Sequence, residues 1–249
     1  MKNFKQQLND GELLLGTLIS IAAPEVAEIL SQAGFDWLFI DAEHAPLSAG
    51  DIQHLIQAAA PLPCLVRVHS LDEIAIKKVL DSGAEGIIVP QVNSAAEAAL
   101  AVAYAKYPPQ GQRGVGIARA QGYGLAFQDY IERANDEVVV IVQAEHARAV
   151  ENIEAIAATP GVDGIFIGPY DLSASLGKMG RLEDPSVREA IQGIGQACRA
   201  AGTRLGVFCT SAEAALPYVE KGFTLITTGT DTLLLGLGGR DMLAKIKAR

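Results

Sequence analysis

Residues 137–177 read EVVVIVQAEHARAVENIEAIAATPGVDGIFIGPYDLSASLG and decide the fold. Two runs in this segment, Val138–Val142 and Gly164–Ile167, are too short and too apolar for anything but buried strands, and a helical pattern separates them. A helix between two buried strands is the usual connection between parallel neighbours. The segment therefore predicts one strand–helix–strand unit of a parallel sheet.

A carboxylate follows each of these two strands. Glu145 comes after the first strand and Asp171 after the second, one strand–helix repeat apart. Because parallel strands end at the same edge, both side chains are expected there, beside the backbone of residues 168–171. Two carboxylates and nearby backbone amides suit a divalent cation and an anionic ligand. The alternative is that both carboxylates only cap the helices that follow them.

The composition indicates one large globular domain over residues 1–249. Hydrophobic residues make up 49% of the 249-residue chain, and no tract is biased in composition. The formal net charge is −9 and lysine and arginine do not cluster, so no nucleic-acid partner is expected. The three cysteines, Cys64, Cys198 and Cys209, lack the spacing of a zinc site or a disulfide framework, and we expect reduced, buried thiols.

The sequence also predicts a soluble, cytoplasmic protein. Residues 1–11 are polar and lack the apolar core of a signal peptide. No run approaches the roughly 20 apolar residues that span a bilayer, so no membrane partner is expected.

The strand–helix pattern repeats along the chain. Helical patterns alternate with eight predicted strands, which is the size and order of a (β/α)8 barrel. A doubly wound open sheet is the alternative, but the turn after the first strand, residues 20–24, lacks a GxGxxG motif. The predicted strands are Leu13–Ile19, Trp37–Ile40, Cys64–Val68, Gly86–Val89, Val138–Val142, Gly164–Ile167, Arg204–Phe208 and Thr224–Thr228. Besides the helical pattern of the central crossover, the predicted helices are Pro24–Gln32, Ser48–Ala60, Asp72–Asp81, Ser94–Lys106, Pro185–Ala201, Ser211–Lys221 and Thr230–Lys247.

One predicted connection, Tyr107–Gln128, is rich in glycine and proline. It is longer than the roughly 2–6 residues that usually join such elements. A long loop in a compact α/β domain usually covers a site, so we expect this loop to do so. Arg113 and Arg119 in this loop could bind a distal substrate carboxylate, although a solvent-facing position is favoured for each.

In a barrel, the polar residues that follow the strands gather at one mouth. Each has an ordinary alternative: His44 could be a loop histidine, and Gln143 could satisfy backbone groups. Arg67 at the end of a buried strand needs anions nearby, because unpaired buried charge is costly. Asp81 ends a helix, where a carboxylate is unfavourable, so it needs Arg67, a histidine or solvent. The residues expected at the mouth are Asp41, Glu43, His44, Arg67, Gln91, Gln143, Glu145, Asp171 and Thr228.

These residue types together indicate carbon–carbon bond chemistry on a 2-oxo acid. A hard cation held by two carboxylates can chelate such an acid and acidify its neighbouring C–H by stabilising an enolate. His44 can then take the proton, and Arg67 can stabilise the oxygen where charge develops. An imine route would need a lysine at a strand end. The candidate lysines all fall in helices or loops: Lys77, Lys78, Lys106 and Lys178.

Six motifs, in this order and spacing, resemble the HpcH/HpaI family of class II pyruvate aldolases. The resemblance covers nearly the whole chain and implies a (β/α)8 barrel of the phosphoenolpyruvate/pyruvate type. It also implies a homohexamer, a trimer of dimers in which paired subunits exchange a helix. The motifs are DAEHAP at 41–46, LVRV at 65–68, LDSGAEGIIVPQV at 80–92, YPPQGQRGVG at 107–116, QAE at 143–145 and FIGPYDLSASLG at 166–177.

The resemblance also implies a role for each matching residue. His44 becomes the base, Arg67 the transition-state stabiliser and Asp81 a residue that raises the basicity of His44, with Asp41 as a second acidic neighbour. Glu145 and Asp171 become the metal ligands. The pyruvate site would then be formed by Gln143, Gly168, Pro169, Tyr170 and Asp171, with Tyr170 and Asp171 acting in part through backbone N–H groups.

Three positions depart from the family pattern. Leu18 stands where family members commonly have tryptophan, and Tyr170 stands where they have alanine or serine. Ala144 replaces a branched apolar residue, which indicates a change in packing. Because Leu18 and Tyr170 would face the aldehyde or the carboxylate, the aldehyde preference of relatives does not carry over to this chain.

The sequence thus predicts a Mg²⁺-, Mn²⁺- or Co²⁺-dependent aldolase. It would cleave 4-hydroxy-2-oxo acids, such as 4-hydroxy-2-oxoheptanedioate or 2-dehydro-3-deoxy sugar acids, to pyruvate and an aldehyde through a metal-stabilised enolate. Hydroxypyruvate is a second possible donor. A citryl- or malyl-CoA-type lyase on the same barrel is one alternative, but it needs a basic groove that is not evident. A non-catalytic 2-oxo-acid-binding protein is the other.

Overall fold

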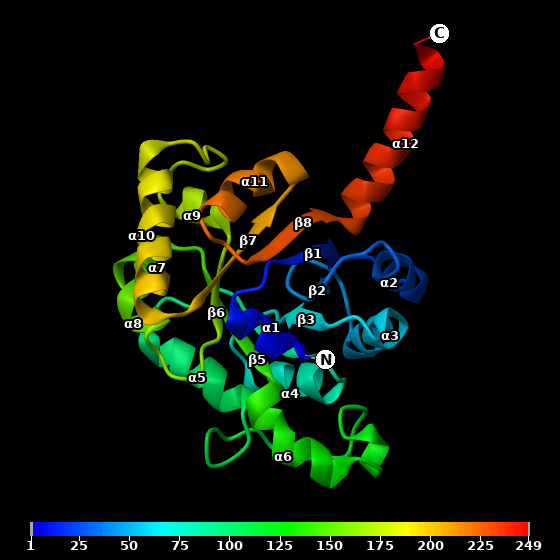
Figure 1. The fold of residues 1–249 in the computed structure, drawn as a ribbon, viewed down its shortest axis with the longest axis vertical. Helices are drawn as coiled ribbons and strands as arrows, with labels where there is room; N and C mark the ends of the chain where they lie inside the picture. Colours follow the sequence, from blue (N-terminus) through cyan, green and yellow to red (C-terminus); the bar gives the residue numbers. More distant parts are fainter. Residues whose placement is uncertain (1, 249) are drawn as a thin grey trace.

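The strands form one closed parallel barrel (Figure 1). The computed structural model describes residues 2–248, and each strand in that range pairs in parallel with the next strand in sequence. The last strand pairs with the first and closes the barrel, which confirms the (β/α)8 prediction and rules out the open sheet. The strands are β1 (Leu14–Ile19), β2 (Trp37–Asp41), β3 (Cys64–Arg67), β4 (Gly86–Val89), β5 (Val139–Ala144), β6 (Gly164–Ile167), β7 (Arg204–Cys209) and β8 (Leu225–Thr230).

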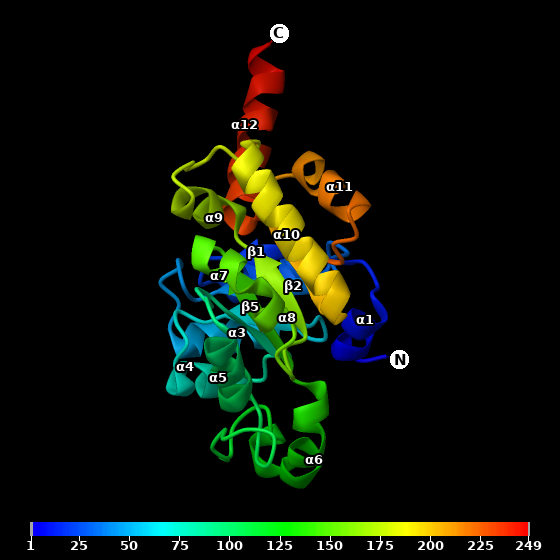
Figure 2. The same ribbon diagram turned by 90° about the vertical axis from the view of Figure 1, so that its left-hand side faces the viewer.

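Helices pack around the barrel, and six of them match the predicted segments (Figure 2). Several begin with a side-chain cap: Ser48, Asp72, Ser94 and Ser211 each accept a hydrogen bond from a backbone N–H of the first turn. Such caps fix where a helix starts, and hence where the preceding loop ends. The six helices are α2 (Pro24–Ser31), α3 (Ala49–Ala59), α4 (Glu73–Asp81), α5 (Ala95–Ala105), α10 (Pro185–Ala201) and α11 (Ala212–Glu220).

The predicted helix of the central crossover is divided in two. The helices α7 (Ala147–Glu151) and α8 (Ile153–Ala157) meet at Asn152, whose backbone leaves the helical region. The Asn152 side-chain amide donates to the carbonyls of Arg148 and Asn93. Asparagine side chains of this kind compete with the backbone pattern of a helix, so the break lies where the side chain binds the neighbouring loop.

Three helices were not predicted: α1 (Phe4–Asp10), α6 (Phe127–Glu137) and α9 (Pro169–Ser175). The first is mostly polar, and it forms because Phe4 and Leu8 are buried in the interior cluster of the barrel. Asn3 and Gln6 close its first turn with a capping box. The third begins at proline, directly after Gly168, and places Asp171 in its first turn rather than in a loop.

Large side chains fill the barrel interior where glycines leave room. A Cβ at Gly16 would lie 2.6 Å from the Trp37 ring, and a Cβ at Gly206 would lie 2.4 Å from the Phe166 ring. Phe39 packs between these two aromatic residues, with ring centroids 6.1 Å from Trp37 and 5.6 Å from Phe166. This aromatic column fills the space below the mouth, so the functional cavity is shallow.

The long loop does not cover the mouth, so that prediction is wrong. Residues 107–126 follow α5, which returns the chain to the amino ends of the strands, and they lead through α6 into the start of β5. The Ala120 N–H donates to the carbonyl of Asp81, and the Arg119 guanidinium donates to that of Ser82. Both acceptors lie at the end of α4, just before β4 begins, so the loop packs at the opposite end of the barrel.

The final helix, α12 (Asp231–Lys247), matches the prediction in extent but projects away from the barrel (Figures 1 and 2). Its apolar side chains are exposed instead of packed, including Leu235 at 72%, Met242 at 65% and Ile246 at 65%. A helix with this much exposed apolar surface needs a partner surface. Among residues 2–248, no helix combines the length and apolar composition needed to cross a bilayer.

Candidate active site

Arg67 and Asp41 form the buried centre of the mouth. They are the last residues of β3 and β2, and the sheet register places them side by side. The Arg67 guanidinium donates from Nε to Asp41 Oδ1 at 2.9 Å and from Nη2 to Oδ2 at 2.8 Å. Burial alone would lower the pKa of Arg67, but the Asp41 carboxylate more than offsets this and the pKa is raised. Arg67 is therefore a fixed, permanent cation, as expected from its place at a strand end.

The turn after β2 carries Glu43 and His44 into the mouth. Asp41 Oδ1 accepts from the backbone N–H groups of Glu43 and His44, so the same carboxylate that holds Arg67 also shapes this turn. Glu43 Oε2 lies 3.2 Å from Arg67 Nε and 3.8 Å from His44 Nε2. Burial raises the pKa of Glu43, and the nearby Arg67 charge opposes that rise. The His44 side chain is 65% exposed and stands at the edge of the site.

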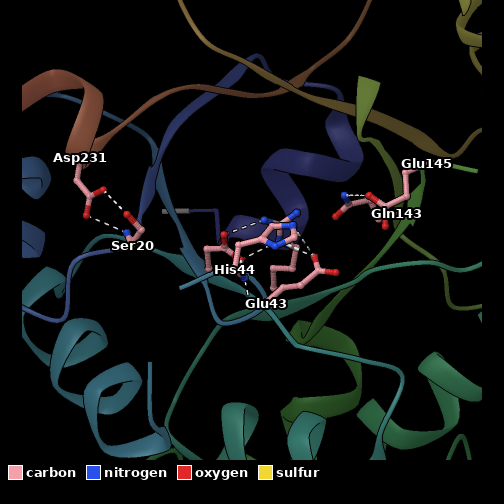
Figure 3. A network of polar contacts seen from close by, with 8 residues as sticks. Ser20, Glu43, His44, Gln143, Glu145 and Asp231 are labelled. Atoms are coloured by element: carbon pink, nitrogen blue, oxygen red, sulfur yellow. Dashed lines mark hydrogen bonds and ion pairs between the residues drawn. The ribbon is translucent and has the colours of Figure 1, made fainter. Parts of the chain in front are cut away.

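Gln143 and Glu145 approach from β5 on another side of the mouth (Figure 3). The Gln143 amide nitrogen contacts Glu145 Oε2, while Glu145 Oε1 accepts from the backbone N–H of Gln91 at 2.9 Å. Gln91 adopts a left-handed backbone with φ of 55°, which is unusual for a residue other than glycine and aims this N–H at the carboxylate. Burial, with the Glu43 and Asp171 charges adding to it, raises the pKa of Glu145 to about 7.

The start of α9 completes this side of the mouth. A Cβ at Gly168 would lie 2.7 Å from Glu145 Oε2 and 2.9 Å from the Gln143 amide nitrogen, so the two side chains occupy space that only glycine leaves free. Pro169 is buried, whereas Tyr170 and Asp171 are exposed in the first turn of the helix. The sequence-predicted residues of β2, β3, β5 and α9 are thus brought together.

A cavity of about 170 Å³ opens among these residues. This volume is smaller than the roughly 300–1,000 Å³ of sites that take drug-sized ligands, so it suits a small molecule. Its floor is aromatic and one wall is polar. The lining residues are Leu18, Phe39, His44, Arg67, Gln143, Phe166, Gly168, Pro169, Tyr170, Asp171 and Phe208.

The polar wall fits a hard divalent cation. Within residues 2–248, the buried oxygens Gln143 Oε1 and Glu43 Oε2 have no hydrogen-bond partner, and buried polar atoms of this kind are uncommon. Glu145 and Asp171 supply carboxylate oxygens, the donors that Mg²⁺ and Mn²⁺ prefer. Within the described chain, no group of three or more histidine, cysteine or acidic side chains is arranged to hold a metal ion. The donor set therefore fits a cation that keeps water or substrate in its other positions.

The structure does not bring Asp81 to His44. Asp81 is the last residue of α4, at the amino end of the barrel, whereas His44 follows a strand at the carboxyl end. Its Oδ1 accepts instead from Arg113 Nη2 at 2.7 Å, and Arg113 is buried against the rings of Tyr107 and Tyr130. The predicted contact between Asp81 and His44 is absent within the described chain, and the solvent-facing prediction for Arg113 is wrong.

Sequence reasoning also missed a second polar pair at the mouth. Asp231, the first residue of α12, is buried and accepts from the backbone N–H and the hydroxyl of Ser20 and from the backbone N–H of Ile21, each at 2.8 Å (Figure 3). It ties the end of β1 to the start of α12. An acidic residue three positions after the last predicted strand was the available signal, but its partner lies 211 residues away.

A closed (β/α)8 barrel whose ionisable residues gather at the carboxyl ends of its strands is the arrangement of barrel enzymes. The comparisons identify which kind: residues 15–236 match the family described as HpcH/HpaI aldolase/citrate lyase, and the chain belongs to this family. The resemblance seen in the motifs is therefore confirmed.

Named relatives match over nearly their full length. The chain is 41% identical over 248 residues to a hydroxypyruvate/pyruvate aldolase of Cupriavidus necator, covering 98% of this chain and 92% of the relative. It is 41% identical over 246 residues to a 4-hydroxy-2-oxo-heptane-1,7-dioate aldolase of Klebsiella pneumoniae, covering 97% and 92%. A solved HpcH/HpaI aldolase/citrate lyase family protein from Burkholderia cenocepacia superimposes with a TM-score of 0.95 at 40% identity, covering 98% of each chain.

Proposed function

We propose that this chain is a class II aldolase that reversibly cleaves 4-hydroxy-2-oxo acids to pyruvate and an aldehyde. The observation that carries the proposal is one small cavity lined by the buried cation Arg67, by His44 and by Gln143, whose amide contacts the buried carboxylate of Glu145. The relatives named as aldolases of hydroxypyruvate, pyruvate and a 4-hydroxy-2-oxo acid support the same reaction class. Residues 1–249 are taken as one catalytic domain, with pyruvate or hydroxypyruvate as donor.

Glu145 and Asp171 would hold the divalent cation, with Gln143 Oε1 as a further oxygen donor nearby. When bound, the cation supplies Lewis-acid polarisation of the substrate's 2-oxo group. Oxygen donors accept Mg²⁺, Mn²⁺ and Co²⁺, so the proposal covers all three. Gly168 leaves room for the side chains of Gln143 and Glu145, because any larger residue would displace them.

Arg67 would stabilise the oxygen that gains negative charge. Its Nε and Nη2 are fixed by Asp41, and its Nη1 donates to no residue within the described chain, so one N–H direction is free for substrate. Because the guanidinium is already oriented, it does not need to reorganise as charge develops. The pyruvate carboxylate is proposed to bind beside Tyr170 and Asp171, at the edge of the same cavity.

His44 would move the proton. Its side chain lines the cavity and remains open to solvent, so Nε2 can accept a proton from substrate and return it in the reverse direction. Glu43 Oε2 lies 3.8 Å from Nε2, beside the nitrogen that would accept the proton. Within one chain, Asp81 has no part in this arrangement, because it is paired with Arg113.

The test is pyruvate release from a 4-hydroxy-2-oxo acid, followed before chelation, in excess chelator and after Mg²⁺ or Mn²⁺ is returned. We expect release to fall at least about 100-fold in chelator and to recover with the metal. Unchanged release in chelator would remove the metal from the mechanism. A protein that binds pyruvate but releases none from any such acid would instead be a non-catalytic binding protein.

The CoA-thioester lyase alternative is less well supported. Cleavage of a CoA ester needs cations for the phosphates of the coenzyme. Among the described residues, Arg67 is the only lysine or arginine that lines the cavity. Two of its donor atoms already bind Asp41. A CoA-thioester cleavage assay separates the two reactions.

We further propose that the chain assembles as a homohexamer, a trimer of dimers in which α12 packs on the partner subunit. The exposed apolar side chains of α12 and its projection from the barrel support this exchange (Figure 1). A cytoplasmic location belongs to the same proposal.

A further inference from the structure

The mouth of the barrel is divided into a charged half and an apolar half. The charged half comes from β2, β3, β5 and the start of α9, which contribute Asp41, Arg67, Glu145 and Asp171. The apolar half is formed by β1, β7 and β8, and Leu18 of β1 and Phe208 of β7 line the cavity there. Figure 3 shows Ser20 and Asp231, which belong to the apolar half, on the side of the mouth away from Gln143 and Glu145.

The connections of the apolar half carry no lysine or arginine. After β1 the chain reads SIAA at residues 20–23, and after β7 it reads TS at residues 210–211. β8 leads directly into α12, whose first residue is Asp231. The side chain of Asp231 is buried and already accepts hydrogen bonds from Ser20 and Ile21, so it offers no cation to a ligand in this half.

Tyr170 stands at the boundary between the two halves. It lines the cavity and is 46% exposed, so its ring is available to a ligand. The nearest cations in sequence, Lys178 and Arg181, lie in the loop after α9 and do not line the cavity. Lys178 is 3.5 Å from Asp184, its ion-pair partner.

We propose that the apolar half is the aldehyde subsite and that it selects acceptors without a charge. A carboxylate placed against Leu18, Phe208 and the Tyr170 ring would lose water without gaining a cation, which is costly. The Asp231 carboxylate on this side of the mouth would also repel it. The substrates of this chain are therefore 4-hydroxy-2-oxo acids whose far end is uncharged, unlike a 1,7-dioate.

This inference rests on the proposed aldolase function and names its substrate class. In the synthetic direction, the new bond joins the methyl carbon of pyruvate to the aldehyde carbon. The methyl group loses one proton and the aldehyde oxygen gains one, so the reaction balances without a co-reactant. The subsite selects by the substituent carried on the aldehyde carbon, and this substituent takes no part in the reaction.

The experiment compares two acceptors of equal length, butanal and 4-oxobutanoate, with pyruvate as donor and the Mg²⁺-loaded protein. We expect kcat/KM for butanal to exceed that for 4-oxobutanoate at least about tenfold, because a buried unpaired carboxylate is disfavoured. Tyr170→Arg adds a cation at the boundary and should reduce this ratio at least about tenfold. Met179→Arg adds the same charge at an exposed position outside the cavity, so it should keep the wild-type ratio.

A second readout separates failure of the inference from failure of the proposed function. Exchange of the pyruvate methyl protons with D₂O, measured by NMR without any aldehyde, reports proton removal alone. If exchange occurs and 4-oxobutanoate reacts as well as butanal, the inference is overturned while the function stands. If neither exchange nor addition occurs, both are overturned. The wild-type ratio decides the inference even if an arginine variant fails to fold.

Discussion

The guanidinium of Arg67 and the carboxylate of Asp41 form a two-pronged ion pair at the ends of neighbouring strands, with N–O distances of 2.9 and 2.8 Å. The same carboxylate accepts from the backbone N–H groups of Glu43 and His44. One buried side chain therefore positions both the cation of the site and the turn that carries its histidine. Stability and activity are coupled at Asp41 for this reason.

Substitutions at Arg67 should separate the effect of its positive charge on turnover from the effect of its hydrogen-bond geometry. Arg67→Lys keeps a cation but cannot donate along two parallel directions, so we expect turnover to fall by about 100-fold. Arg67→Ala leaves Asp41 buried without its partner and should also destabilise the fold by about 3 kcal/mol. Chemical denaturation and pyruvate release measure the two effects. A lysine variant with wild-type turnover would remove the guanidinium from the mechanism.

Gly168→Ala should damage the site more than the fold. The added methyl group would lie within 3 Å of Glu145 Oε2 and the Gln143 amide, which can move aside because they are side-chain ends. We therefore expect a loss of stability below about 1 kcal/mol. Mn²⁺ affinity, measured by isothermal titration, should fall at least about tenfold because both donors are displaced. Unchanged Mn²⁺ affinity would show that these groups do not hold the metal.

Glu145→Gln tests the carboxylate itself, with Glu151→Gln on the exposed side of α7 as the matched control. The buried amide keeps the size of the side chain but removes its negative charge. Mn²⁺ binding should weaken at least about tenfold in the first variant and stay the same in the second. Equal binding by both variants would contradict the assignment.

Lys106 gives the fold a pH dependence. Its ammonium donates to the carbonyls of Asn135 and Val138 at the amino end of the barrel, and burial, with the nearby Lys5 charge, lowers its pKa to about 7. In the unfolded chain this lysine has its ordinary pKa near 10.4, so the unfolded state binds more protons between pH 7 and pH 10. Stability from this group therefore rises with pH across that window.

The check compares the urea midpoint of the wild type with that of Lys106→Met between pH 7 and pH 9.5. We expect the variant to have a flatter profile, because it lacks the group whose pKa differs between the folded and unfolded states. Parallel profiles would mean that Lys106 stays charged in the fold.

The apolar side chains of α12 should control assembly. Leu235→Lys combined with Met242→Lys places two charges on exposed apolar positions, and Arg240→Glu changes a charge on the same helix as the control. Light scattering should give a smaller assembly for the double variant and the wild-type mass for the control. A wild-type protein that is monomeric at working concentration would overturn the helix exchange.

The strands and most outer helices could be predicted because their signals are local. Buried β-branched runs such as Val139–Ala144 read as strands wherever they occur, and serine caps such as Ser48 mark helix starts. The helix α1 was missed because two apolar residues do not make a pattern, and its stability comes from the barrel interior that Phe4 and Leu8 reach.

The part of the site that lies at the ends of strands could be predicted from the sequence. Asp41, Arg67, Gln143 and Glu145 follow or end strands, and parallel topology alone brings them together. Partners across long loops could not be predicted, because they depend on the path of the loop. For this reason the hydrogen bond between Arg113 and Asp81 was not predicted. The hydrogen bond between Asp231 and Ser20, which lie near opposite ends of the chain, was not predicted either.

The central claim is that this mouth removes a proton from pyruvate with the help of a divalent cation. Exchange of the pyruvate methyl protons with D₂O, followed by NMR on the chelated and the Mg²⁺-reloaded protein, tests it most directly. We predict exchange at least about 100-fold faster with Mg²⁺ than after chelation, and loss of that exchange in Arg67→Lys. Equal exchange with and without the metal, or none in either state, would contradict the account.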